Sequence, residues 1–172
     1  SAFLILGTGT GGCICNENGV IYGKDSFAGE FHKLPFINFS NGKMDNMGDY
    51  ASMTALINIY NDKVDENVKI KYGHEVCNKY FEGDNTAKEA VDQWIDNILV
   101  QLITITVFYN PEVICIGGGI SEEEWFINKI KDKYREECIR HTECDVITTK
   151  IDRCKYNNDA NILGAIINAI KK

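Results

Sequence analysis

The feature that most constrains the fold is a long apolar stripe between Thr86 and Tyr109. Apolar side chains recur there at helical spacing, and Pro111 ends the run. The stripe consists of Ala87, Ala90, Val91, Trp94, Ile95, Ile98, Leu102 and Ile105. A helix this apolar must lie against a core, and the buried strand predicted at Val113–Gly119 follows it directly. Helix followed by buried strand predicts a layered α/β protein.

Shorter periodic segments surround this helix. Apolar runs or alternation predict strands at Ala2–Leu6, Gly12–Asn16, Val20–Gly23 and Asp145–Ile151. Helical spacing predicts helices at Asn46–Tyr60, at Gly73–Phe81, from Ser121 to about Arg140, and at Asp159–Ile170. Residues 31–45 are expected to be irregular. The order of elements predicts a mixed sheet with helices packed on it. Because Pro and Gly mark no internal boundary, we expect residues 1–172 to form a single domain.

The same pattern makes finer predictions. Capping boxes are expected at Thr86 with Glu89 and at Ser121 with Glu124. The last helix should face inward through Ile162, Leu163, Ile166 and Ile167. The long helix and this last helix are also the candidates for a homodimer interface, although packing in the core is the simpler role for both.

Composition excludes some classes of function. The net charge of −7 disfavours contact with nucleic acid, and the basic residues of Ile127–Arg140 are interspersed with acids as on a solvated helix face. No apolar run is long enough to cross a membrane. The seven cysteines are odd in number and lack a CxxC pair, which favours core thiols in a cytoplasmic protein. Cys13 and Cys15 would share one face of a strand, so core packing is favoured over metal binding.

The glycine-rich segment Gly7–Gly12 has three competing interpretations besides a hairpin that binds nothing. Gly7, Gly9 and Gly12 spell GxGxxG, but a dinucleotide fingerprint must open a helix, and a hairpin follows here. A P-loop is disfavoured because Cys13 stands where its lysine belongs. The third interpretation is a turn whose backbone N–H groups, with the Thr8 and Thr10 hydroxyls, face a phosphate.

A second glycine cluster favours the phosphate interpretation. Gly117, Gly118 and Gly119 end a buried strand and precede a helix, where ligands of α/β sheets bind. Two strand-to-glycine turns in one layer would flank one nucleotide. The alternative is a tight turn between strand and helix without a ligand.

Four blocks of sequence together resemble the repressor/open-reading-frame/kinase (ROK) family of sugar kinases and sugar-sensing repressors. They are LGTGTGGCICNENGVIYGKDSFAGEFHK, NMGDYASMTALI, NPEVICIGGGIS and NDANILGAIINA, and they span nearly the whole chain. The resemblance implies one ribonuclease-H-like lobe of the two-lobed actin-like ATPase fold, with ATP and a sugar in the cleft. It implies that Gly7–Gly12 approaches the β- and γ-phosphates and that Gly117–Gly119 lies along the adenosine end.

The resemblance also implies a sugar site that departs from the family pattern. Glu30 in "AGEF" would accept hydrogen bonds from sugar hydroxyls. His32 stands one position from the family's sugar-contacting histidine and is either that residue or a surface histidine. Gly48 occupies the place of a second sugar-binding glutamate, and Asp49, one step later, need not reach the same hydroxyl.

Two further features of the family are missing. Residues 33–47 hold no cysteine, so we expect no structural zinc and expect Phe36, Ile37 and Phe39 to brace the sugar pocket. The family's catalytic aspartate lies upstream of the glycine loop, so we assign no catalytic residue, and Asp159 is expected to cap a helix.

The prediction for function is therefore the C-terminal lobe of an ATP- and magnesium-dependent hexose or N-acetylhexosamine kinase, nearly inactive alone. The alternative is the effector domain of a sugar-responsive repressor. Intact glycine loops favour the kinase, because a sensor needs no phosphate contacts, whereas the altered sugar motif favours the repressor.

Overall fold

A five-stranded mixed sheet forms the centre of the molecule in the computed structural model, which describes residues 1–38, 40–156 and 159–170. Its spatial order is β3-β2-β1-β6-β7. The strands are β1 (Ala2–Leu6), β2 (Thr10–Asn16), β3 (Gly19–Ile21), β6 (Val113–Gly117) and β7 (Lys150–Arg153). The first three form an antiparallel meander, and β6 and β7 run parallel to β1. The predicted mixed sheet is confirmed.

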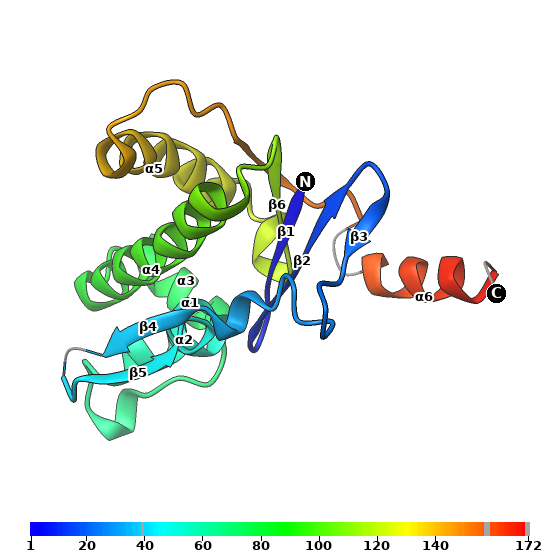
Figure 1. Ribbon diagram of the computed structural model, residues 1–172. Helices are drawn as coiled ribbons and strands as arrows, with labels where there is room; N and C mark the ends of the chain where they lie inside the picture. Colours follow the sequence, from blue (N-terminus) through cyan, green and yellow to red (C-terminus); the bar gives the residue numbers. More distant parts are fainter. Residues whose placement is uncertain (39, 157–158, 171–172) are drawn as a thin grey trace.

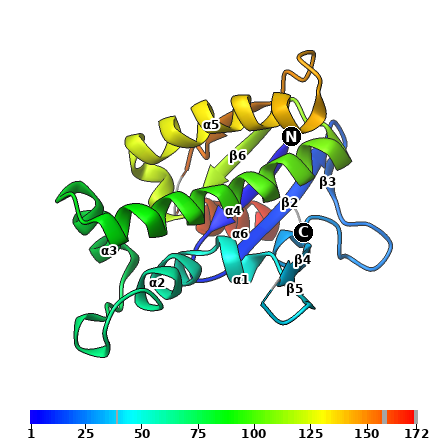
Figure 2. The same ribbon diagram turned by 90° about the vertical axis from the view of Figure 1, so that its left-hand side faces the viewer.

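Two long helices cover one face of this sheet, α4 (Asn85–Tyr109) and α5 (Glu124–Thr142) (Figures 1 and 2). All eight residues of the predicted α4 stripe are buried. Ala2, Leu4 and Leu6 point toward the helices, as the alternation of side chains along a strand requires. The Trp94 and Phe126 rings stack at 5.2 Å between centroids, so α4 and α5 share this core.

The segment between β3 and α4 is more regular than predicted. It contains η1 (Phe31–Lys33), β4 (Pro35–Asn38), β5 (Lys43–Asn46), α1 (Gly48–Ala51), α2 (Met53–Asn61), η2 (Glu66–Val68) and α3 (Gly73–Phe81). The expectation that residues 31–45 are irregular is therefore wrong, because β4 and β5 pair as a hairpin. A continuous helix from Asn46 is also wrong. Ser52 is extended and its hydroxyl accepts from the Ala55 N–H, so it ends α1 and caps α2.

Both predicted capping boxes are wrong. Asp84, two residues before Thr86, accepts from the Ala87 N–H at 2.8 Å and begins α4. Ser121 lies in the short helix η3 (Gly119–Glu122) and donates to the Gly118 carbonyl at 2.7 Å. The α5 helix begins one turn later without a side-chain cap.

The C-terminal region departs most from expectation. The strand predicted at Asp145–Ile151 is β7, which begins only at Lys150. Helix α6 (Ala160–Ile170) lies on the side of the sheet opposite α4 and α5 (Figures 1 and 2). The four residues expected to face inward are at least 36% exposed: Ile162, Leu163, Ile166 and Ile167. Asn158, in the last quoted block, lies outside the described residues. None of the described helices is long and apolar enough to cross a membrane.

Candidate functional site

The first glycine segment is a short turn followed by a strand. Gly7–Gly9 form the turn, closed by the Gly7 N–H on the Gly9 carbonyl at 2.9 Å, whereas Thr10–Gly12 already belong to β2. The Gly7 carbonyl accepts from the Met53 N–H at 2.9 Å, which ties the turn to the start of α2. Thr10 is buried, and its hydroxyl oxygen has no partner among the described residues. The turn thus presents exposed backbone beside an unsatisfied hydroxyl.

Gly11 and Gly12 lie outside this turn, within β2. A Cβ on Gly12 would lie 2.3 Å from the Phe31 ring and 2.7 Å from the Phe3 carbonyl. Gly12 is therefore required by close packing of the segment after β3. This structural requirement is distinct from the phosphate role predicted for the whole of Gly7–Gly12.

The second glycine turn lies directly beside the first. β1 and β6 are parallel neighbours with Ile5 opposite Gly117, so both turns leave the same edge of the sheet. Gly118 has φ +92°, and a Cβ there would lie 2.0 Å from the Leu6 carbonyl oxygen. Only glycine permits this approach of the two backbones. Gly119 is exposed and borders a cavity of about 200 Å³ between α3 and α5, where the indole N–H of Trp125 is buried without a partner in the described structure.

His32 and Asp49 gather on the opposite flank of the first turn. The His32 ring lies over Gly48 so closely that a Cβ on Gly48 would be 1.9 Å from the ring Nδ1. His32 Nε2 lies 3.7 Å from Asp49 Oδ1, and a Cβ on Gly9 would be 3.8 Å from Nδ1. The structure therefore brings together His32, Asp49 and the glycine turn, which lie far apart in sequence.

Glu30 is not part of that cluster. Its carboxylate makes no hydrogen bond or ion pair within the part of the chain that the structure describes. It borders a separate, mostly apolar cavity of about 290 Å³, between the Phe27–Pro35 segment and the C-terminal end of α4. The three predicted sugar-site residues thus occupy two places rather than one.

Polar side chains on one face of α4 hold this region in place. Trp94 donates to the Ala51 and Ser52 carbonyls at 3.0 and 2.9 Å, and Asn97 donates to the Tyr50 carbonyl at 3.0 Å. Gln101 donates to the Phe31 carbonyl at 2.8 Å. Sequence reasoning missed these bonds. The spacing 94, 97 and 101 was a usable signal, since polar residues at helical spacing within an apolar helix need buried partners.

Comparison with known proteins identifies the family. A family model described as "ROK family" matches residues 1–172. The chain belongs to the ROK family. An uncharacterised protein of Clostridium perfringens, CPE0188, is 34% identical over 97% of this chain and 54% of its own length. An N-acetyl-D-glucosamine kinase of Vibrio atlanticus is 27% identical over 99% of this chain and 59% of its own length. The chain thus spans little more than half the length of these two relatives.

Solved ROK structures confirm the fold. A ROK family protein of Streptococcus pneumoniae, solved with sucrose, superposes with a TM-score of 0.86 at 25% identity, covering 99% of this chain and 57% of that one. A ROK glucokinase of Streptomyces griseus, solved with glucose and AMPPNP, gives 0.82 at 21% identity, covering 99% and 60%. The expectation of an actin-like ATPase, ribonuclease-H-like fold is confirmed.

A polar and aromatic cluster braces the β4–β5 hairpin, next to the predicted sugar-site residues His32 and Asp49 of this ROK chain. The Asp45 carboxylate accepts from the Tyr50 hydroxyl and from the Asn38 amide, the latter at 3.0 Å. The hydrogen bond from Tyr50, then that from Asn38, hold the pKa of Asp45 below its usual range. Phe36 packs on Tyr50 at 4.3 Å between ring centroids, whereas Ile37 is 57% exposed, so the bracing role predicted for Ile37 is wrong. Phe39 lies outside the described residues.

Over residues 1–38, 40–156 and 159–170, no three His, Cys, Asp or Glu side chains converge as metal ligands would. Burial, followed by the neighbouring Cys15, raises the pKa of the Cys13 thiol to about 11, so the thiolate that a metal requires is disfavoured.

Proposed function

We propose that this chain is the C-terminal lobe of an ATP-dependent hexose or N-acetylhexosamine kinase and that residues 1–172 fold as one domain. The observation that carries the proposal is the juxtaposition of the two glycine turns, with Gly118 against Leu6, at the carboxyl edge of neighbouring parallel strands. That edge is where α/β sheets bind nucleotides. The names of the Vibrio and Streptomyces relatives support a sugar as the phosphoryl acceptor.

The chemistry available here is binding and charge stabilisation. Phosphoryl transfer depends mostly on positioning and electrostatic stabilisation, which backbone N–H donors supply well. Gly7, Thr8, Gly9 and Thr10 would contact phosphates, and the Thr10 hydroxyl fits this role because it lacks another partner. Gly117, Gly118 and Gly119 would lie along the nucleoside, next to the cavity at Trp125. Gly11 and Gly12 would support the turn from β2.

The residues at the two glycine turns suit the binding of a nucleotide better than the direct binding of a magnesium ion. Within the described ranges no carboxylate cluster lies at the glycine turns, so magnesium would enter with the phosphates of ATP. ATP with magnesium would supply the transferring group. Glu30, His32 and Asp49 would bind the sugar, with His32 held in place by Gly48 and Asp49. The general base is proposed to belong to a part of the kinase outside this chain, which alone would turn over little or no substrate.

The test is nucleotide binding measured residue by residue. Titration of the ¹⁵N-labelled chain with magnesium AMPPNP should shift the amide signals of Gly7–Thr10 and Gly117–Gly119, with a Kd in the millimolar range because half the cleft is absent. Thr10→Val removes the buried hydroxyl at nearly constant volume and should weaken binding about fivefold or more. Thr54→Val, an exposed threonine of α2, is the matched control. Shifts confined to other regions, or turnover by the chain alone, would contradict the proposal.

The competing proposal is the effector domain of a sugar-responsive ROK repressor. Gly48 favours it, since a sugar-binding carboxylate of the family pattern is missing there. Sugar-induced shifts at His32 and Asp49 without any nucleotide response would favour this alternative. In either case the chain itself is expected to contact no nucleic acid. The seven free cysteines support the expectation of a cytoplasmic location.

A further inference from the structure

A cavity of about 500 Å³ lies between α5 and the segment that leads into β7. Three cations line it, Lys131 and Arg135 from α5 and Lys150 from β7, together with one acid, Asp145. Lys150 pairs with Val113 at the start of β6, whereas the second glycine turn follows the end of that strand. The cavity therefore lies toward the edge of the sheet opposite the candidate site, and none of the proposed nucleotide or sugar residues borders it.

The positive charge at this cavity is concentrated in a chain that is acidic overall. The whole chain carries a net charge of −7. Lys131 and Arg135 are four positions apart on α5, so their charges lie on one face of the helix and repel each other. Lys150 adds a third positive charge from the facing strand. A cavity lined by charges of one sign attracts ions of the opposite sign, so this arrangement suits an anion.

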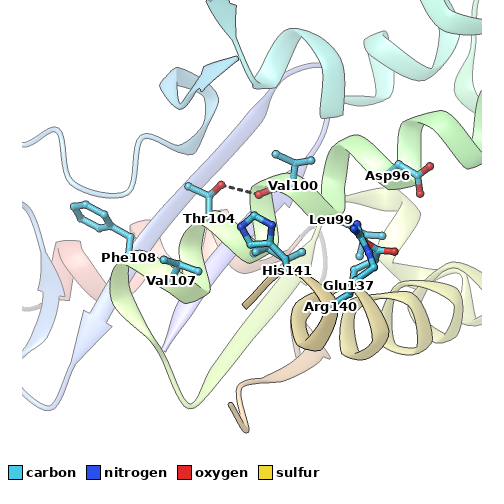
Figure 3. Close-up of a pocket in the computed structure, with 10 residues that line it drawn as sticks. Asp96, Leu99, Val100, Thr104, Val107, Phe108, Glu137, Arg140 and His141 are labelled. Carbon is cyan, nitrogen blue, oxygen red and sulfur yellow. Dashed lines mark hydrogen bonds and ion pairs between the residues drawn. The ribbon is translucent and has the colours of Figure 1, made fainter. Parts of the chain in front are cut away.

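On the side of α5 that faces α4, the basic residues are neutralised within the chain. Lys133 lies 2.9 Å from Asp96, and Arg140 is paired with Glu137. Figure 3 shows Asp96, Glu137 and Arg140 around the groove between the two helices. Each of these cations thus has a carboxylate of the same chain as its partner.

The cations at the cavity lack comparable partners. Over residues 1–38, 40–156 and 159–170, neither Arg135 nor Lys150 forms an ion pair, and Asp145 pairs with none of the three cations. Lys131 lies 3.6 Å from Asp152, whose side chain is 66% exposed, so water weakens this pair. At least two of the three positive charges are therefore available to a ligand.

We propose that this cavity binds the phosphate group of a small phosphorylated metabolite. A phosphate monoester carries a charge of about −2 and three strong acceptor oxygens. The Arg135 guanidinium can donate to two of these oxygens at once, and Lys131 and Lys150 supply two further charges. The exposed Thr148 hydroxyl also lines the cavity and can donate a further hydrogen bond.

The rest of the lining favours a phosphate ester over a free phosphate ion. Ile139 and Ile147 line the cavity, and its volume of about 500 Å³ is typical of a site for a small organic molecule. The carbon skeleton of an ester can pack on these apolar side chains, whereas a free phosphate ion would leave them uncovered. Thr149 donates to the Pro111 carbonyl at 2.7 Å, which holds the segment that carries Thr148 in place.

The experiment is a titration of the ¹⁵N-labelled chain with glucose 6-phosphate at constant ionic strength. We expect saturable shifts of the amide signals of Arg135 and of residues 148–150, and no shift of these signals with glucose, which lacks the phosphate. Inorganic phosphate should bind at least about threefold more weakly, because it lacks the apolar contacts. Shifts at residues 7–10 would report on the nucleotide site instead, so this cavity and the proposed kinase function are tested separately.

Two variants test whether the charges at the cavity cause the binding. Arg135→Gln removes one charge at an exposed position and should raise the Kd for glucose 6-phosphate at least about fivefold. Arg140→Gln is the matched control, because it removes the same charge from the same helix outside the cavity, and it should change the Kd less than about twofold. Circular dichroism should show both variants folded, since neither side chain is buried.

The same titrations can overturn the proposal. No saturable shift at Arg135 and residues 148–150 would mean that the cavity does not bind a phosphate group. An equal loss of affinity in Arg135→Gln and Arg140→Gln would mean that binding reflects general charge attraction rather than this cavity. Equal affinity for inorganic phosphate and for glucose 6-phosphate would support the anion site but overturn its assignment to an ester.

Discussion

Two adjacent glycines of the second turn have opposite structural roles. Gly118 combines φ +92° with a 2.0 Å approach of its missing Cβ to the Leu6 carbonyl oxygen. Gly118→Ala should therefore lower the free energy of unfolding by about 2–4 kcal/mol, through backbone strain and overlap with β1. Urea denaturation of the purified variant measures this loss. A change below about 0.5 kcal/mol would show that the two turns do not meet as described.

Gly119 supplies the matched control for that prediction. No atom lies within 4 Å of its missing Cβ, and its φ is not positive. Gly119→Ala should change the free energy of unfolding by no more than about 0.5 kcal/mol. Because Gly119 borders the cavity at Trp125, the same variant should instead weaken nucleotide binding in the proposed lobe. The pair of variants separates glycines needed for folding from those available to a ligand.

His32 and Gly48 should be energetically coupled. Gly48→Ala places a methyl group where the His32 ring now lies, and we expect a loss of about 1–3 kcal/mol in the free energy of unfolding. In a His32→Ala background the same substitution should cost at least about 1 kcal/mol less, because the ring is gone. Denaturation of the four proteins in this double-mutant cycle measures the coupling. Equal costs in both backgrounds would contradict the geometry.

At the scale of single residues, the sequence predicts which positions have a particular role better than it predicts the contacts that require it. The motif pointed to His32, Gly48 and Asp49, but not to the packing of the imidazole on Gly48. That contact joins residues 16 positions apart across the β4–β5 hairpin, and no local periodicity in the sequence predicts it. Glu30 shows the opposite outcome. The AGEF motif grouped Glu30 with His32, whereas in the structure Glu30 borders a different cavity.

Among the elements, the β4–β5 hairpin should depend on pH through Asp45. Hydrogen bonds from Tyr50 and Asn38 lower the pKa of Asp45 in the folded chain. A lowered pKa stabilises the fold above the pKa of the unfolded state, and this contribution is lost as the pH falls through the folded value. Amide exchange in Lys43–Asn46 should therefore accelerate below about pH 4. Tyr50→Phe, which removes one donor, should shift that acceleration to higher pH, and an unchanged profile would contradict the assignment.

Helices and strands with a strong hydrophobic period in the sequence were predicted well, and those without such a period were not. The α4 stripe and β1 follow from apolar repeats that only one burial pattern satisfies. The β4–β5 hairpin was missed because Pro35, Ser40 and Asn41 resemble an irregular connection, although Asn41-Gly42 is a usable hairpin signal. Both predicted capping residues were misplaced by two positions, Thr86 for Asp84 and Ser121 for Glu123, since polar residues within one turn compete for this role.

On the scale of the whole molecule, α6 carries apolar side chains that are exposed in the described structure. Its apolar residues were expected to face inward because isoleucine and leucine at helical spacing normally meet a core. They are exposed instead, in a chain that spans 54% of the length of CPE0188 and 59% of that of the Vibrio kinase. The sequence thus predicted an inward-facing α6, but not that its apolar residues would be exposed in the described structure.

The last prediction follows from that exposure. Ile166 and Ile170 are 50% and 78% exposed, so replacing both by Asp should change the free energy of unfolding of this chain by no more than about 0.5 kcal/mol. In a chimera completed with the part of CPE0188 that this chain does not match, the same pair should cost about 3 kcal/mol or more, because two isoleucines would then be buried. Val68→Asp, at a 47% exposed position of η2, should have little effect in either protein. Equal effects of the Asp pair in both proteins would mean that the added part of the relative does not cover α6.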